Sequence, residues 1–228
     1  MEEKPKVAAI VPAYNESATI GNVLKALLAA KEIDEIIVVS DGSTDETAQI
    51  SRSLGVKVLE NPERGGKGKA MRRGVENTTA EIICFFDADL IGLIPQHINQ
   101  LVEPVLKSEA AMVVGIRDRI GETPLFLLRI DPLLAFGGER VLRREIFLNI
   151  PERFSRGFEI ETALNFYCQV NKLPVRYVKL KGLKMIIKEK KYGLVKGFWG
   201  RVKMEWEILK TRLLLLWSKQ DFKKNSKF

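Results

Sequence analysis

Short apolar runs alternate with helical segments through the first half of the chain. The apolar runs, which are typical of buried strands, occupy residues 7–11, 35–40, 56–59, 82–86 and 111–116. The segments between them, where apolar residues recur every three or four positions, occupy residues 20–31, 45–54, 67–78 and 94–107. This alternation predicts an α/β fold, in which helices flank a mostly parallel sheet.

The pattern loosens after residue 117. Residues 118–138 contain several glycines and prolines, which predicts a long loop over one edge of the sheet. Further helices are expected at 139–148 and 158–170, and short strands at 175–180 and 185–187. The chain has 228 residues, 46% of them hydrophobic, which is enough for one domain with a substantial core.

The opening residues and the cysteines indicate a cytoplasmic protein. The chain begins Met1-Glu2-Glu3-Lys4, so we expect no secretory signal, and no apolar run approaches the ~18–20 residues of a spanning helix. Cys84 and Cys168 lack the spacing of metal ligands, as expected for inert thiols in a reducing compartment.

Positive charge is concentrated at the C-terminus. The net charge is +8, yet residues 181–228 hold fourteen Lys or Arg against four Asp or Glu, whereas residues 1–180 sum to −2. We expect a catalytic domain at 1–193 and a basic helical tail at 194–228. The tail carries an apolar stripe at three- and four-residue steps, which packs against the domain or a partner subunit, or lies on an anionic bilayer. The tail is too apolar for a nucleic-acid-binding arm, so no nucleic acid partner is expected.

Acidic residues follow the apolar run at 82–86. Asp87 and Asp89 stand where a strand ends, and ligands of open α/β sheets bind outside the carboxyl ends of the strands. Mg²⁺ and Mn²⁺ favour one or two carboxylates together with substrate phosphates. The pair therefore predicts a metal–diphosphate site, although an Asp-x-Asp also occurs as a simple helix cap.

Glycines and lysines precede the helix expected at 67–78. The segment Gly65-Gly66-Lys67-Gly68-Lys69 suits a phosphate cradle of backbone N–H groups and fixed positive charge, or else a plain surface loop. It does not match Walker A, and no Gly-x-Gly-x-x-Gly follows the first strand, which argues against dinucleotide binding.

The chain resembles family 2 glycosyltransferases of the GT-A fold. The resemblance lies in Val11-Pro12-Ala13-Tyr14-Asn15-Glu16, Ser40-Asp41-Gly42-Ser43-Thr44-Asp45, Gly66-Lys67-Gly68 and Asp87-Ala88-Asp89-Leu90. It covers residues 6–120, weakens beyond them, and extends to the polyprenyl-phosphate sugar transferases and the glucosyl-3-phosphoglycerate synthases.

The resemblance implies a role for each matching residue. The nucleotide-sugar site would comprise Pro12, Tyr14, Glu16, Asp41, Lys67, Lys69 and Asp87. Asp41 would contact the base, and Asp89, assisted by Asp87, would bind Mg²⁺ or Mn²⁺. Soluble relatives add a late histidine to the metal. Here residues 182–185 lack one, and the chain's only histidine, His97, is expected to be structural.

The acceptor side is predicted from arginines and glutamates. Arg117, Arg119 and Arg140 suit an acceptor phosphate, although a solvated basic helix face would also explain Arg140. Glu159 and Glu161 occupy the segment that supplies acceptor-side carboxylates in the family, so with Asp89 they are the predicted catalytic residues.

The predicted function is transfer of a hexose from a nucleoside diphosphate sugar. The leading acceptor is a polyprenyl phosphate at the cytosolic membrane face, because the tail has a membrane-seeking pattern. The alternative acceptor is a small phosphorylated acid such as 3-phosphoglycerate. A non-catalytic protein that binds the sugar nucleotide is a hypothesis of a different class.

Overall fold

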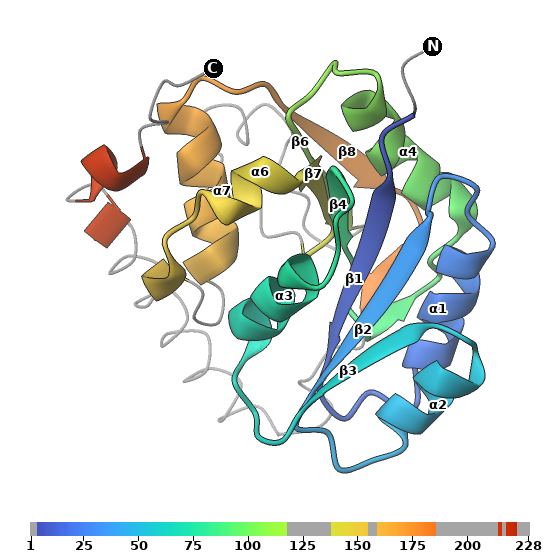
Figure 1. Cartoon of the computed structure of the whole chain (residues 1–228). Coiled ribbons are helices and arrows are strands. Elements are labelled where there is room, and N and C mark those ends of the chain that lie inside the picture. Colours follow the sequence, from blue (N-terminus) through green and yellow to red (C-terminus); the bar gives the residue numbers. More distant parts are fainter. Residues whose placement is uncertain (1–3, 118–137, 155–158, 186–213, 216–217, 223–228) are drawn as a thin grey trace, which may run out of the picture.

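A seven-stranded sheet forms the centre of the molecule (Figure 1). The computed structural model describes residues 4–117, 138–154, 159–185, 214–215 and 218–222. The strand order is β3-β2-β1-β4-β7-β6-β8, and every pairing is parallel except the two that involve β7. The strands are β1 (Val7–Ala13), β2 (Glu35–Asp41), β3 (Lys57–Asn61), β4 (Ile82–Phe85), β6 (Met112–Arg117), β7 (Arg140–Arg143) and β8 (Val175–Leu180), while β5 (Leu90–Ile91) and β9 (Lys184–Met185) form a separate antiparallel pair.

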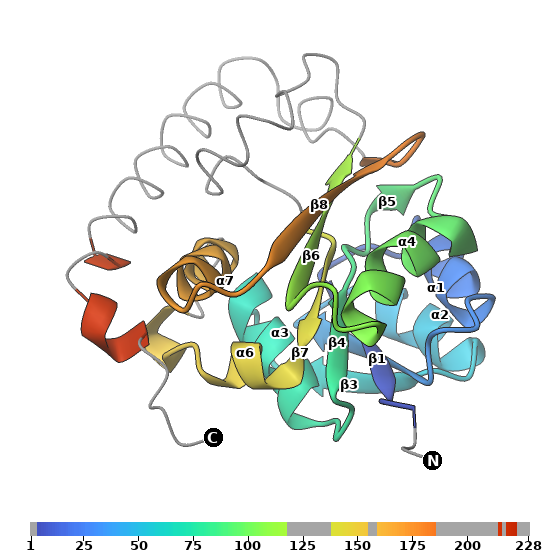
Figure 2. The same ribbon diagram turned by 90° about the horizontal axis from the view of Figure 1, so that it is seen from above.

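Helices cover both faces of this sheet, giving three layers (Figure 2). The helices are α1 (Ile20–Leu28), α2 (Thr47–Ser53) and α4 (Pro95–Leu106) on one face, and α3 (Lys67–Glu76), α6 (Arg144–Leu148) and α7 (Glu159–Val170) on the other. Each face has its own apolar core, because alternate residues of the strands point to opposite sides. The predicted α/β class and mostly parallel sheet are confirmed.

The helix predicted at 139–148 is wrong in its first half. Residues 140–143 form β7, which lies antiparallel between β4 and β6, and only residues 144–148 are helical. Val141 packs in the core beside α1 and α4, whereas Leu142 packs in the core beside α3 and α7. Only an extended chain places two consecutive side chains on opposite faces of a sheet, and residues 140–143 take this form because they fill the place between β4 and β6.

The described part of the C-terminal tail packs against the domain. Phe222, in the 3₁₀ turn η3 (Lys219–Phe222), is fully buried between Phe154 of the 3₁₀ turn η2 (Glu152–Phe154) and Phe166 of α7, with ring centroids 5.2 Å from each. Asn171 Nδ2 donates to the Phe222 carbonyl oxygen at 2.7 Å, and Leu215 is also fully buried.

Leu215 and Phe222 thus belong to the core of the domain, although neither is part of the apolar stripe predicted for the tail. Within the described residues, no helix is long and apolar enough to cross a membrane. The residues of the apolar stripe predicted within 194–217, the expected domain boundary at residue 193 and all but the last residue of the loop predicted at 118–138 lie outside the described residues. The bilayer-binding prediction for the tail stays a prediction.

Candidate active site

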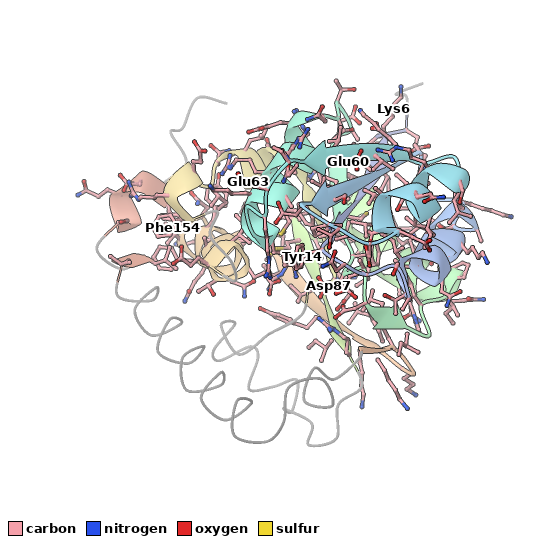
Figure 3. All side chains as sticks on the ribbon, turned by 90° about the horizontal axis from the view of Figure 1, so that it is seen from below. Lys6, Tyr14, Glu60, Glu63, Asp87 and Phe154 are labelled. Atoms are coloured by element: carbon pink, nitrogen blue, oxygen red, sulfur yellow. The ribbon has the colours of Figure 1, made fainter. Side chains whose placement is uncertain are left out.

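The candidate site lies at the carboxyl edge of the sheet, which Figure 3 views end-on with Tyr14 and Asp87 labelled. Parallel strands β1, β2, β4 and β6 end at this edge, so the residues that follow them meet there. Because β7 runs the other way, its first residue pairs with Phe85 at the end of β4. The residues just before β7, Gly138 and Glu139, are thereby brought to the same edge.

Asp41, at the end of β2, is held by backbone and side-chain donors. Its carboxylate accepts hydrogen bonds from the Gly65 and Gly66 N–H groups, at 2.9 and 2.7 Å, and from Asn61 Nδ2 at 2.6 Å. The N–H groups of the predicted phosphate cradle are thus already engaged by a carboxylate of the protein. A carboxylate has about four acceptor positions, so Asp41 retains capacity for one donor from a nucleotide base.

The loop after β1 forms the adjoining wall. Tyr14 is partly exposed, and the Arg64 guanidinium stacks on its ring at 4.1 Å from the centroid. Asp45 fixes this loop to the start of α2, since its carboxylate accepts from the N–H groups of Ser17 and Thr47, each at 3.0 Å. Burial alone would raise the pKa of Asp45, but these bonds and one from the Thr47 hydroxyl outweigh burial and lower it to about 2.

Lys67, the first residue of α3, bridges two carboxylates from distant parts of the sequence. Its Nζ lies 2.6 Å from Asp87 Oδ1 and 2.8 Å from Glu161 Oε1 on α7. Burial would lower the pKa of Lys67, yet the charges of Asp87 and Glu161 outweigh burial and raise the pKa above its usual value. The structure thus joins a predicted donor-side residue to a predicted acceptor-side residue.

Arg117, at the end of β6, makes a second bridge. Its Nη2 donates to Asp87 Oδ2 at 3.1 Å, and its Nε donates to Glu139 Oε2 at 2.9 Å. Burial would lower the pKa of Arg117, but the neighbouring charges of Glu139, Asp87 and Asp89 raise it. For Glu139, which has no exposed surface, burial first and then the charge of Asp87 raise the pKa above its usual value, while the charge of Arg117 acts in the opposite direction.

Asp87 and Asp89 are the predicted metal ligands, and that role stays a prediction. Asp89 is 8% exposed, and both oxygens of Asp87 contact Lys67 and Arg117, so a cation at Asp87 would compete with two ion pairs. Within the described residues no group of three or more His, Cys, Asp or Glu could hold a metal ion. Hard cations with one or two carboxylate ligands and substrate phosphates need no such cluster, so the donor set fits Mg²⁺ or Mn²⁺.

Of the predicted acceptor-binding arginines, the structure describes Arg117 and Arg140, which lie on the neighbouring strands β6 and β7. Arg140 is fully buried in β7 and donates to Asn165 Oδ1 of α7 at 2.7 Å, which excludes the solvated helix face weighed for it. Arg117 is turned toward Asp87, and Arg119 lies outside the described residues. Their role in acceptor binding stays a prediction, as does the catalytic role of Glu159, which begins α7.

The remaining predicted residues lie around the same edge. Pro12 lies in the last part of β1 and Glu16 in the loop that follows, and both are half-buried, whereas Lys69 is exposed on α3. His97 is buried in α4, where its Nε2 lies 3.0 Å from the Lys181 carbonyl oxygen, consistent with the structural role expected for it.

Gly138 and Glu139 were missed by sequence reasoning. A Cβ on Gly138 would lie 2.3 Å from Asp87 Oδ2, so a glycine is needed for the close approach of the two segments. The one signal in the sequence was the charged pair Glu139-Arg140, which stands between Gly137-Gly138 and the apolar pair Val141-Leu142.

Comparison with known proteins supports the resemblance to family 2 glycosyltransferases. Residues 8–176 match the family described as glycosyl transferase family 2. The chain is 32% identical over 190 residues to glucosyl-3-phosphoglycerate synthase of Mycolicibacterium smegmatis, covering 69% of this chain and 62% of that protein. It is 31% identical over 133 residues to glycosyltransferase AglD of Haloferax volcanii, covering 52% and 21%.

Solved structures share the fold. The crystal structure of glucosyl-3-phosphoglycerate synthase from Mycobacterium tuberculosis with Mn²⁺, uridine diphosphate and glucosyl-3-phosphoglycerate superposes with a TM-score of 0.74 and 26% identity, covering 92% of this chain and 79% of that one. The chain spans about three-fifths of the length of the Mycolicibacterium synthase. The match to the family extends over most of the chain, and the residues at the carboxyl edge of its sheet are those through which the sequence resembles that family. The chain belongs to glycosyl transferase family 2.

Proposed function

We propose that this chain transfers glucose from UDP-glucose to a small phosphorylated acid of the 3-phosphoglycerate type, with Mg²⁺ or Mn²⁺ as cofactor. The observation that carries the proposal is the similarity to synthases whose crystal structures hold Mn²⁺, UDP-glucose and phosphoglyceric acid. A polyprenyl phosphate, the acceptor favoured by the tail pattern alone, has no comparable support, since the matched synthases act on phosphoglycerate by name.

The charges at the site support a diphosphate donor and a divalent cation. Around Asp87, the carboxyl groups of Asp87, Asp89, Glu139 and Glu161 outnumber the cations Lys67 and Arg117 with which they interact. That excess of carboxylate suits a hard cation held by Asp89, with the donor diphosphate completing its coordination. Such a cation would supply Lewis-acid stabilisation of the departing diphosphate.

The chain's own residues would bind and orient the two substrates and take up a proton from the acceptor. Asp41 would accept a hydrogen bond from the base, and the ring of Tyr14 would line the nucleotide pocket. Lys67 would place positive charge near the diphosphate, where negative charge develops as the glycosidic bond breaks. Because the acceptor of this reaction is a hydroxyl, Glu159 or Glu161 would take up its proton.

The first test is nucleotide binding by thermal unfolding. A ligand that binds only the folded protein at a hundred times its Kd stabilises it by about 2.7 kcal/mol, or roughly 5–10 °C for a chain of this size. We expect that shift with UDP and Mn²⁺, and neither with UDP in EDTA nor with GDP or CDP. Asp89→Asn should abolish this shift. Glu103→Gln, which likewise replaces a carboxylate by an amide but on the exposed face of α4, should retain it.

The second test is transfer itself. Purified chain with UDP-glucose and Mn²⁺ should release UDP when 3-phosphoglycerate is added and not when a polyprenyl phosphate is added. Activity with the lipid phosphate alone would restore the membrane-side reaction. UDP binding without turnover on either acceptor would favour a non-catalytic sugar-nucleotide-binding protein.

A further inference from the structure

Glu139 is a carboxylate buried at a position that an apolar residue would fill at lower cost. It has no exposed surface, and it directly precedes β7. Its Oε2 accepts from Arg117, but its Oε1 has no hydrogen-bond partner among the described residues. A buried ion pair with an unsatisfied oxygen is weak support for stability, because replacing it by apolar residues is often neutral or stabilising.

The contacts of Glu139 lead to Asp87 through one planar group. The Arg117 guanidinium donates through Nε to Glu139 and through Nη2 to Asp87, at 2.9 and 3.1 Å. Since the guanidinium is rigid, holding one nitrogen fixes the direction of the other. Gly138 closes the remaining side of Asp87, because even a methyl group there would overlap the carboxylate.

Arg117 has little freedom to take another position. Its side chain is 7% exposed and that of Glu139 is 0% exposed, whereas Asp87 is 16% exposed and is the member of the three that a ligand can reach. Exposure therefore increases from Glu139 through Arg117 to Asp87, as expected if the two buried residues hold the carboxylate that contacts the ligand.

We propose that Glu139 is a positioning residue, which orients Asp87 toward the nucleotide sugar by anchoring Arg117. The inference deepens the proposed function and rests on it, since Asp87 is taken to contact the donor. Lys67 holds the other oxygen of Asp87, so the carboxylate is fixed between two cations. Each cation has a second carboxylate partner, Glu161 for Lys67 and Glu139 for Arg117, and of these two partners Glu139 is the one with no exposed surface.

The test uses variants that separate charge from shape. Glu139→Gln keeps the size of the side chain and removes its charge, Glu139→Asp keeps the charge and withdraws it by one methylene, and Glu145→Gln removes the same charge from an exposed position on α6. Calorimetric titration with UDP and Mn²⁺ gives Kd, and steady-state assays give KM for UDP-glucose and for 3-phosphoglycerate separately.

Glu139→Gln should weaken UDP binding about tenfold, the size expected when one charge-assisted hydrogen bond at a binding site is lost. The KM for the acceptor should stay within about twofold, and Glu145→Gln should match the wild type. In an Arg117→Lys background, Glu139→Gln should add less than about twofold, because the residue acts through Arg117. Unchanged Kd in Glu139→Gln, equal effects on both KM values, or the full tenfold effect in Arg117→Lys would each overturn the inference.

A crystal structure of Glu139→Gln separates this inference from the proposed function. We expect the Arg117–Asp87 contact to be lost or Asp87 to be turned, whether or not the protein binds UDP. An Asp87 carboxylate in its wild-type position would refute the inference, whereas failure of the wild-type chain to bind UDP would refute the proposed function alone.

Discussion

Two adjacent leucines in the C-terminal tail allow a sharp test of how the tail is used. Leu215 is fully buried in the core beside α7, whereas Leu214 is 48% exposed. Replacing each by alanine makes the same chemical change at neighbouring positions. If the tail is part of the domain, only Leu215→Ala should affect its stability.

The magnitude follows from burial. Truncating a buried leucine to alanine costs about 2–5 kcal/mol, and the lower half of that range applies to a site near the edge of a core, which can partly collapse. At roughly 2–4 °C per kcal/mol for a chain of this size, Leu215→Ala should lower Tm by about 4–14 °C. Leu214→Ala should change it by less than about 2 °C, as for an ordinary surface substitution.

Differential scanning calorimetry of the two variants and of Phe222→Ala provides the measurement. Phe222→Ala should lower Tm at least as much as Leu215→Ala, because its ring fills the space between Phe154 and Phe166. Equal and small effects of both leucine variants would refute the packing argument. Combined with salt-sensitive binding to anionic vesicles that both variants weaken, that result would favour a membrane-bound tail.

Two further predictions concern the site. Asp45 has a folded-state pKa below its unfolded value, so its contribution is present above pH ~4 and is lost as the pH falls toward 2. Asp45→Asn should therefore lower the free energy of unfolding at pH 7 by ~1 kcal/mol, a value discounted for the partial exposure of the group. In urea unfolding, the difference between the variant and the wild type should shrink between pH 4 and pH 2. A difference that does not change with pH would contradict this prediction. Gly138→Ala should weaken UDP–Mn²⁺ binding about tenfold by displacing Asp87, the loss of roughly one charge-assisted contact. Gly74→Ala, whose added methyl would meet Ile10 Cγ2 at 2.4 Å in the core, should lower Tm and leave Kd unchanged, and equal Kd values for wild type and Gly138→Ala would refute the steric argument.

Local patterns predicted the elements of the first half of the chain well. The helices and the strands of the main sheet up to residue 117 occur where periodicity placed them, whereas the two-residue strand β5 was not predicted. Resemblance at the strand ends also identified Asp41, Lys67 and Asp87, which the parallel topology brings to one edge. These are features that neighbouring residues determine.

Features that depend on distant partners could not be predicted. The ten residues after Gly138 have a spacing of apolar residues that suits either one helix or a strand and a short helix, and only the gap between β4 and β6 decides. The Gly65–Gly66 N–H groups suit a phosphate in isolation, and it is Asp41, twenty-four residues earlier than Gly65, that engages them. Charge alone likewise could not show that Arg117 turns toward Asp87.

The ion pairs of Lys67 link the two halves of the site. Lys67 contacts Asp87 after β4 and Glu161 on α7, so a group that draws Lys67 toward itself removes a partner from both carboxylates. The diphosphate of the proposed donor is such a group, and a divalent cation arriving with it would offset the charge uncovered on the donor side. Nothing comparable arrives beside Glu161, which would lose its ion-pair partner when Lys67 moves away. Donor binding would thus free a carboxylate on the acceptor side, and the two predicted sets of residues would be coupled through one shared lysine.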